Sequence, residues 1–91
     1  MDAAIRAMVF ERDQWQCQYC GDRAVHIDHI ICKALRRRHR LPDNDPAFLV
    51  AACFACNVRR GTLRLIPPSF ADRISELPGT KPWRVWRGGA L

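Results

Sequence analysis

Two C-x-x-C pairs constrain the fold of this chain more than any other feature of its sequence. They are separated by 32 residues, and a fifth cysteine, Cys32, lies between them. Paired cysteines of this kind are typical of a structural zinc ion bound by four thiolates. A disulfide framework is the alternative, but the odd cysteine fits a reducing compartment better. We therefore predict a structural Zn²⁺ bound by Cys17, Cys20, Cys53 and Cys56.

The length of 91 residues predicts a single domain over residues 1–91. A core of this size leaves a thin margin of stability, so a staple of some kind is expected, and the cysteines indicate which. The first residues, MDAAIRAMVFERDQ, carry charged groups where a signal peptide needs an apolar run. No stretch of the sequence approaches the ~18 apolar residues of a membrane span. We therefore expect an intracellular, cytoplasmic protein.

The net charge of +6 is concentrated in basic runs. The longest is KALRRRHR at residues 33–40, and further arginines follow the second cysteine pair. Such clusters favour a polyanionic partner, because each contact with a phosphate releases counterions. A solvated basic loop that serves solubility is the alternative. We predict nucleic-acid contacts at Arg36, Arg37, Arg38 and Arg60, with double-stranded DNA expected and RNA left open.

The hydropathy pattern predicts helices and strands around the two cysteine pairs. Asp2 is suited to cap a helix over residues 2–13, whose apolar face would hold Ile5, Met8 and Val9. The next expected elements are a strand at 24–31, a loop at 32–46 with a short helical piece at 33–39, and a strand at 48–50.

The second cysteine pair is expected to run into a short helix that Gly61 ends. After two prolines, Ser69 is suited to cap a small helix. The apolar residues expected on one face of that helix are Phe70, Ile74 and Leu77. The last apolar residues of the tail are expected to fold back onto the core; they are Trp83, Val85 and Trp86.

The segment VHIDHI at 25–30 has the aliphatic residues of a β-strand but also three titratable groups. Alternation along a strand directs His26 and Asp28 to one face and His29 to the other. A half-buried strand with a solvated polar face is the plain interpretation, and one histidine alone would favour it. Three such groups within four positions need the rest of the sequence to decide.

Three segments together resemble the zinc-knuckle branch of the HNH nucleases, which have the ββα-metal fold. They are RDQWQCQYCG, VHIDHI and LVAACFACNVRRG. The resemblance covers roughly residues 10–62 and leaves a tail at 63–91. It implies an α+β fold: a small, zinc-stapled, treble-clef-like domain with an N-terminal helix and an irregular C-terminal tail.

The resemblance implies a role for each residue that matches the family pattern. Asp28 matches the carboxylate that binds a catalytic divalent cation, and Asn57 matches the second protein ligand of that ion. His29 matches the general base that activates water, and histidine can accept a proton at neutral pH. Oxygen ligands suit Mg²⁺ or Mn²⁺, whereas His26, a possible further ligand, would widen the choice toward Ni²⁺, Co²⁺ or Zn²⁺. Because Asp28 and His29 must approach one phosphate, we predict that the strand twists or ends at about His29.

Two positions depart from the family pattern. Phe48 stands where the family has an asparagine that staples a loop and helps to hold the ring of the base histidine. Asn44 or Asp45 could take over that role from the adjacent loop. Cys32 replaces the usual proline after the strand. A small apolar filler is one interpretation of Cys32, and a fifth ligand or a redox role is the other.

These residues predict a metal-dependent DNA endonuclease that hydrolyses phosphodiester bonds with a histidine general base and one divalent cation. The chain also resembles small phage or prophage HNH proteins that act beside the terminase during DNA packaging, in an infected or prophage-bearing bacterial cell. The main alternative is a zinc-knuckle module that binds DNA or a protein without catalysis, which Phe48 favours. A toxin-like nuclease with an immunity partner is a third interpretation, but it would need a delivery domain.

Overall fold

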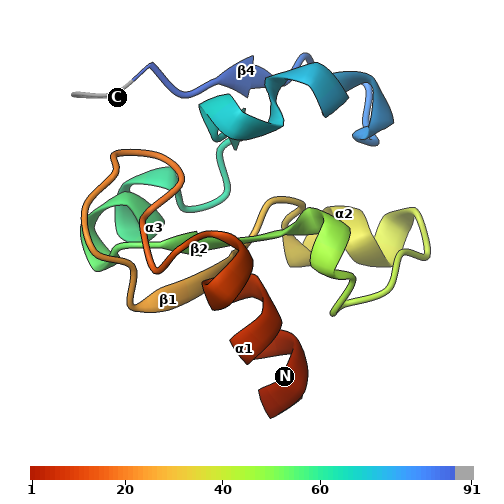
Figure 1. The fold of residues 1–91 in the computed structure, drawn as a ribbon. Coiled ribbons are helices and arrows are strands. Elements are labelled where there is room, and N and C mark those ends of the chain that lie inside the picture. The colour runs from red at the N-terminus through yellow and green to blue at the C-terminus, as the bar shows by residue number, and fades with distance from the viewer. Residues whose placement is uncertain (88–91) are drawn as a thin grey trace.

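An antiparallel pair of strands, β1 (His26–His29) and β2 (Leu49–Ala52), lies at the centre of the fold (Figure 1). The computed structural model describes residues 1–87. His26 lies opposite Ala52, and His29 lies opposite Leu49. Hydrogen bonds of 3.0 Å from the backbone N of Val25 and of Ile30 extend the pairing beyond each end of β1. Both expected strands are therefore present, with somewhat different bounds.

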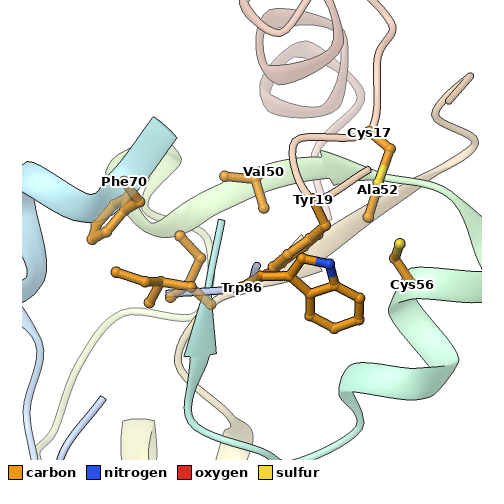
Figure 2. Packing of buried hydrophobic residues seen from close by; sticks show 9 residues of the cluster. Cys17, Tyr19, Val50, Ala52, Cys56, Phe70 and Trp86 are labelled. Carbon is orange, nitrogen blue, oxygen red and sulfur yellow. The ribbon is translucent and has the colours of Figure 1, made fainter. Parts of the chain in front are cut away.

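The two faces of the strand pair are covered by different parts of the chain. On one face, Ala51 and the half-buried Ile27 pack against Phe10 of the N-terminal helix. On the other face, Val50 and Ala52 belong to a larger core cluster formed with the cysteine knuckles and the tail (Figure 2). Every residue of β2 is buried, which explains why its sequence, LVAA, is wholly apolar.

Helix α1 (Ala3–Arg12) begins as the sequence predicts, because the Asp2 side chain accepts a 2.8 Å hydrogen bond from the backbone N of Ala4. Its buried face differs from the expectation. Val9 and Phe10 are buried, whereas Met8 is 53% exposed. The reason is that α1 meets the strand pair at its C-terminal end, while its first turns project away (Figure 1).

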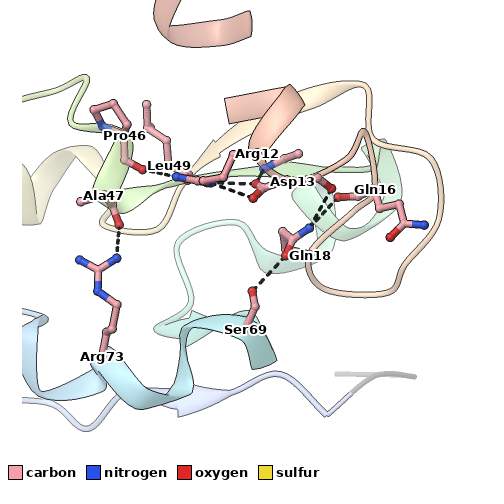
Figure 3. Close-up of polar contacts among 10 residues, drawn as sticks. Arg12, Asp13, Gln16, Gln18, Pro46, Ala47, Leu49, Ser69 and Arg73 are labelled. Atoms are coloured by element: carbon pink, nitrogen blue, oxygen red, sulfur yellow. Dashed lines mark hydrogen bonds and ion pairs between the residues drawn. The ribbon is translucent and has the colours of Figure 1, made fainter. Parts of the chain in front are cut away.

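Two polar residues attach the end of α1 to the strand pair. Asp13 accepts a 2.8 Å hydrogen bond from the backbone N of Ala51 and pairs with Arg12 at 2.9 Å. Arg12 also donates to the carbonyl oxygens of Leu49 at 2.5 Å and of Pro46 at 2.8 Å (Figure 3). This network fixes the position of β2 relative to the helix.

The connection between the two strands contains two short helices. Helix α2 (Lys33–Arg38) confirms the expected helical piece in the basic run. The 3₁₀ helix η1 (Pro46–Phe48) leads directly into β2 and is capped by Asp45, whose side chain accepts a 3.0 Å hydrogen bond from the backbone N of Ala47. After β2, helix α3 (Phe54–Arg60) begins within the second cysteine pair, with Cys53 as its N-cap, and ends at Gly61, as predicted. The positive φ of 50° at Gly61 is a conformation that glycine adopts without a steric penalty.

The tail is more regular than the sequence predicts. Strand β3 (Leu65–Ile66) pairs in parallel with β4 (Arg84–Val85), and the 3₁₀ helix η2 (Pro68–Glu76) connects them. Within the described residues the tail therefore consists of two two-residue strands and one 3₁₀ helix, with the rest irregular as expected. Ser69 does not cap η2; its hydroxyl donates to the side-chain oxygen of Gln18 at 3.1 Å (Figure 3).

The three-residue period of η2 also changes its buried face. Phe70 is buried and Arg73, one turn later, lies 4.6 Å from the centre of its ring. Ile74, which an α-helix would have placed beside Phe70, is 36% exposed. Arg73 donates a 3.0 Å hydrogen bond to the carbonyl of Ala47, so η2 is attached to the loop before β2.

The end of the tail packs onto the core as predicted. Trp86 is only 2% exposed and meets Tyr19 edge to face, with 5.4 Å between the ring centres (Figure 2). Trp83 and Val85 are half-buried against the same cluster. The tail thus covers the face of the strand pair opposite α1 (Figure 1). Within residues 1–87, no helix has both the length and the apolar character needed to cross a membrane.

Candidate functional site

Four thiols from two distant segments lie together beside the strand pair. Cys17 and Cys20 follow α1, and Cys53 and Cys56 stand at the start of α3. Their sulfur atoms all lie within 4.8 Å of one another, and the Sγ atoms of Cys20 and Cys53 are 3.7 Å apart. Tetrahedral zinc, with Zn–S bonds of about 2.3 Å, requires sulfur–sulfur distances of about 3.8 Å. The cluster therefore has the composition and dimensions of a tetrathiolate zinc site.

The disulfide alternative does not agree with these positions. All five cysteines are free thiols, and a disulfide would need a sulfur–sulfur distance of about 2.05 Å. Cys32 lies outside the four-thiol cluster, so its interpretation as a fifth ligand is not supported in the described part of the chain.

The protonation of the thiols depends on what lies among them. Burial raises the pKa of Cys56 and of Cys20, and the neighbouring thiols raise that of Cys56 further. Two backbone donors point at the sulfurs: Cys56 N donates to Cys53 Sγ at 3.4 Å, and Asp22 N donates to Cys20 Sγ at 3.5 Å. A cation among the four sulfurs would stabilise their thiolate forms, and the site could hold a zinc ion for this reason.

Asp28 lies on the face of β1 that is covered by α3 and by the segment of the first cysteine pair, Cys17–Cys20. It is 7% exposed, and its carboxylate accepts a 2.5 Å hydrogen bond from the hydroxyl of Tyr19. The guanidinium of Arg60 stands 3.3–3.4 Å from the two carboxylate oxygens. Burial raises the pKa of Asp28, while the charge of Arg60 and the hydroxyl of Tyr19 oppose that rise. The carboxylate is thus a buried acidic group with two partners.

Arg60 is held in the interior, which corrects the expectation of a phosphate contact at this residue. Its side chain is 2% exposed, and its Nε donates to the carbonyl of Leu65 at 2.8 Å. Its Nη1 donates to the carbonyl of His29 at 2.9 Å, and its Nη2 donates to the carbonyl of Ile30. Arg60 therefore joins α3, the end of β1 and the start of the tail, and it has no donor to offer on the surface.

His29 faces the opposite side of the strand pair from Asp28. It is half-buried and lines a small hollow together with Arg36, Asp43 and Phe48. Strand β1 ends at His29, as the sequence predicts for a residue that must approach a phosphate. The two side chains have separate partners here, as strand alternation requires.

The position expected to carry a loop-stapling asparagine has a different environment. Phe48 packs 6.1 Å from Phe70, centre to centre, and its carbonyl accepts a 3.0 Å hydrogen bond from Ile30 N. Asp45 caps η1 by accepting a hydrogen bond from the backbone N of Ala47, and its role toward the ring of His29 stays a prediction. The backbone beside His29 is therefore held through η1 and Asp45.

Two further candidate ligands lie on the same side of the fold as Asp28. Asn57, on α3, is half-buried, and its side-chain amide forms no hydrogen bond with any of residues 1–87. His26 is half-buried at the start of β1, with its ring 5.8 Å from that of Phe54. Asn57 thus offers an amide oxygen that no other described residue binds.

The basic run of α2 divides into engaged and free side chains. Arg36 pairs with Asp43 at 3.0 Å, donates to the carbonyl of Ile31 at 2.5 Å and holds the pKa of Asp43 below its usual value. Because these donors are used, Arg36 is a poorer candidate for a phosphate contact than the sequence suggested. Arg37 and Arg38 are exposed and form no ion pair within residues 1–87.

The comparisons with known proteins agree with this arrangement. The family model described as HNH endonuclease matches residues 17–63, which include both cysteine pairs and all of β1, β2 and α3. The chain belongs to the HNH endonuclease family. Searches of curated proteins and of solved structures gave no match. HNH nucleases act on DNA, so membership suggests a nuclease-type activity, and the small α+β fold with its four-thiol cluster is consistent with the family.

Tyr19 and Trp86 are the residues of this HNH domain that sequence reasoning missed as part of the site. Tyr19 lies inside the first C-x-x-C pair, where a hydroxyl could have been recognised as a donor to a neighbouring acid. Trp86 was expected in the core, but no sequence signal indicates that it would cover Tyr19. Such a contact joins residues 67 positions apart and arises only in the folded chain.

Proposed function

We propose that this chain is a metal-dependent endonuclease that hydrolyses phosphodiester bonds in DNA. The observation that supports it most strongly is the HNH match over residues 17–63, which contains the Asp28–His29 pair and Asn57. The basic surface of α2, with Arg37 and Arg38 exposed, supports a polyanionic substrate. The resemblance to phage HNH proteins makes DNA packaging or processing a candidate setting, with a terminase as a candidate partner.

In the proposed reaction His29 takes a proton from the water molecule that attacks the phosphorus atom. The bond between phosphorus and the 3′-oxygen then breaks, and the departing oxygen takes a proton from a solvent water, which leaves 5′-phosphate and 3′-hydroxyl ends. Asp28 and Asn57 would hold a divalent ion, Mg²⁺ or Mn²⁺, which when bound neutralises charge on the phosphate and on the departing oxygen. Arg60 keeps the end of β1 against α3, because α3 carries it and its Nη1 donates to the carbonyl of His29.

The donor chemistry of Asp28 and Asn57 suits a hard divalent cation, because both offer oxygen ligands and the amide has no partner within residues 1–87. Asp28 already has a cation nearby in Arg60. The 3.3–3.4 Å distances between the two groups exceed the usual 2.7–2.9 Å of charge-assisted hydrogen bonds, while Arg60 reaches the carbonyls of Leu65 and His29 at 2.8 and 2.9 Å. We propose that the ion binds Asp28 in place of the long Arg60 contact.

A zinc-knuckle module that binds DNA without cutting it is the second candidate. The burial of Asp28 between Tyr19 and Arg60 favours it, because a carboxylate with two partners can serve a purely structural role. The apolar contacts of Phe48 favour it as well, since no side-chain amide stands at that position.

Cleavage of supercoiled plasmid separates the two candidates. With Mg²⁺ or Mn²⁺ present, we expect the wild type to nick or linearise the plasmid, and His29→Ala to be slower by about 10²- to 10⁴-fold, because it lacks the base. His39→Ala is the matched control, since His39 is exposed at the end of α2 and should cleave at the wild-type rate. A wild-type protein that retards the plasmid in a gel and never cuts it would support the binding module instead.

A further inference from the structure

A cleft in the tail lies on the far side of the fold from α1. Its volume is about 540 Å³, and it is formed where β3 and β4 run side by side. The residues that line it and matter here are Leu63, Arg64, Leu65, Lys81, Pro82 and Arg84. Apart from Thr62 and Leu63, the lining residues lie beyond residues 17–63, so the three charged residues of this cleft are outside the family match.

The cleft is positively charged and has no acidic residue in its lining. Its three cations are Arg64, Lys81 and Arg84. The four ion pairs within residues 1–87 are formed by other residues, so none of these three charges is neutralised by a described carboxylate. Lys81 and Arg84 are exposed, and Arg64 is half-buried.

The three cationic residues lie on or beside the paired strands β3 and β4. Arg84 N donates to the carbonyl of Arg64 at 2.9 Å, which joins the two strands. The Arg64 guanidinium donates to the carbonyl of Lys81 at 3.2 Å and lies 5.8 Å from the ring centre of Trp83. Gly79 leaves room for it, because a Cβ there would stand 2.2 Å from Arg64 Nη1. The Arg64 guanidinium is therefore held in place before any ligand arrives, which lowers the entropic cost of binding, while Lys81 and Arg84 share the frame through their backbones.

We propose that this cleft binds the phosphate backbone of the nucleic-acid substrate, as a second contact separate from α2. Three uncompensated cations suit a chain of phosphates, and the apolar side chains of Leu63, Leu65 and Pro82 suit the deoxyribose between them. The inference rests on the proposed function for the identity of the partner. It adds that the tail, and not only the HNH core, sets the affinity for DNA.

The test compares two double variants that remove the same charge. Lys81→Gln with Arg84→Gln empties the cleft of its two exposed cations. Arg6→Gln with Arg23→Gln removes two exposed arginines near α1, outside the cleft. Binding of a fluorescent duplex is followed by anisotropy over a series of salt concentrations, without a divalent ion, so that no cleavage occurs. Thermal melts check that both zinc-loaded variants fold, which is expected because the altered side chains are exposed.

Each phosphate contact contributes about 0.9 to the slope of log K against log salt concentration. For the cleft variant we expect the slope to fall in magnitude by about 2 and Kd to rise on the order of 10- to 100-fold at 0.1 M salt. The control should change far less. Equal slopes for the two variants, or a wild type that binds no DNA, would overturn the inference.

Cleavage is measured separately, so the two proposals can fail independently. A protein whose DNA affinity depends on the cleft but which never cuts would retain this inference and lose the proposed endonuclease activity. A protein that cuts DNA, and whose DNA affinity is unchanged by substitution of Lys81 and Arg84, would retain the proposed endonuclease activity and lose this inference.

Discussion

Asp28 and Arg60 show how strongly the role of a residue depends on its surroundings. The sequence places Asp28 in a family motif and Arg60 in a basic run, which predicted a metal ligand and a phosphate contact. In the folded chain each is the other's buried partner. Removing one member of such a pair leaves an uncompensated charge in the interior, at a cost of about 3–5 kcal/mol. Substitution of either residue therefore reports on folding as well as on chemistry.

Asn57 is a cleaner probe of the proposed divalent ion, because its amide has no partner within residues 1–87 that folding would lose. We expect Asn57→Ala to melt like the wild type and to bind Mn²⁺ at least about tenfold more weakly, since one of two protein ligands is gone. Isothermal titration of the zinc-loaded protein with Mn²⁺ measures this. Asn44→Ala, an exposed loop asparagine, is the control, and an unchanged Mn²⁺ affinity in Asn57→Ala would remove Asn57 from the ligand set.

At the scale of elements, the two knuckles decide how the helices meet the strands. The four-thiol cluster joins the segment after α1 to the start of α3, across 32 intervening residues. Those residues hold β1, α2, η1 and β2. The cluster thus closes a long loop, and its metal would set the angle at which α3 packs on β1.

Loss of one zinc ligand should therefore unfold the domain. A structural zinc contributes on the order of 10 kcal/mol to folding, which matches the whole stability of a small domain. We expect Cys17→Ser to lose both the cooperative melt and one equivalent of bound zinc, measured by circular dichroism and by elemental analysis.

Cys32→Ser provides the control for a cysteine substitution of the same kind. Cys32 lies outside the four-thiol cluster, so this variant should keep its zinc and melt close to the wild type. If Cys17→Ser instead melted like Cys32→Ser, the cluster would not be the staple of the fold.

For the whole molecule, the tail completes the core that the HNH segment begins. Residues 17–63 supply β1, β2 and α3, but the larger core cluster also needs Ile66, Phe70 and Trp86. Trp86 covers Tyr19, whose hydroxyl holds Asp28, so the tail reaches the candidate site through one intermediate residue. The stability of the tail and the position of Asp28 are coupled through the contacts of Tyr19 with Trp86 and with Asp28.

Trp86→Ala should reveal that coupling. Truncating a buried tryptophan costs about 3–5 kcal/mol, so we expect a large drop in the urea midpoint of unfolding. Trp15→Ala is the matched control, because Trp15 is 51% exposed and stacks only on Phe10; its loss should cost about 1 kcal/mol. Equal losses in the two variants would mean that the tail adds little to the core.

Local spacing was enough to predict much of this protein. Each C-x-x-C pair, the cap at Asp2 and the end of α3 at Gly61 follow from residue types within a few positions of one another. The α+β class and the HNH resemblance follow from motifs of the same local kind. Such signals survive in sequence because they depend on backbone conformation and ligand type.

Only the tertiary structure decided which distant residues come into contact. The burial of Arg60 against Asp28, the approach of Trp86 to Tyr19 and the pairing of β3 with β4 join positions that are 19 to 67 residues apart. The buried face of α1 likewise depends on where its end meets β2, and the face of η2 on a three-residue period. These outcomes follow from the competition of many side chains for one small interior, and no local pattern encodes the result.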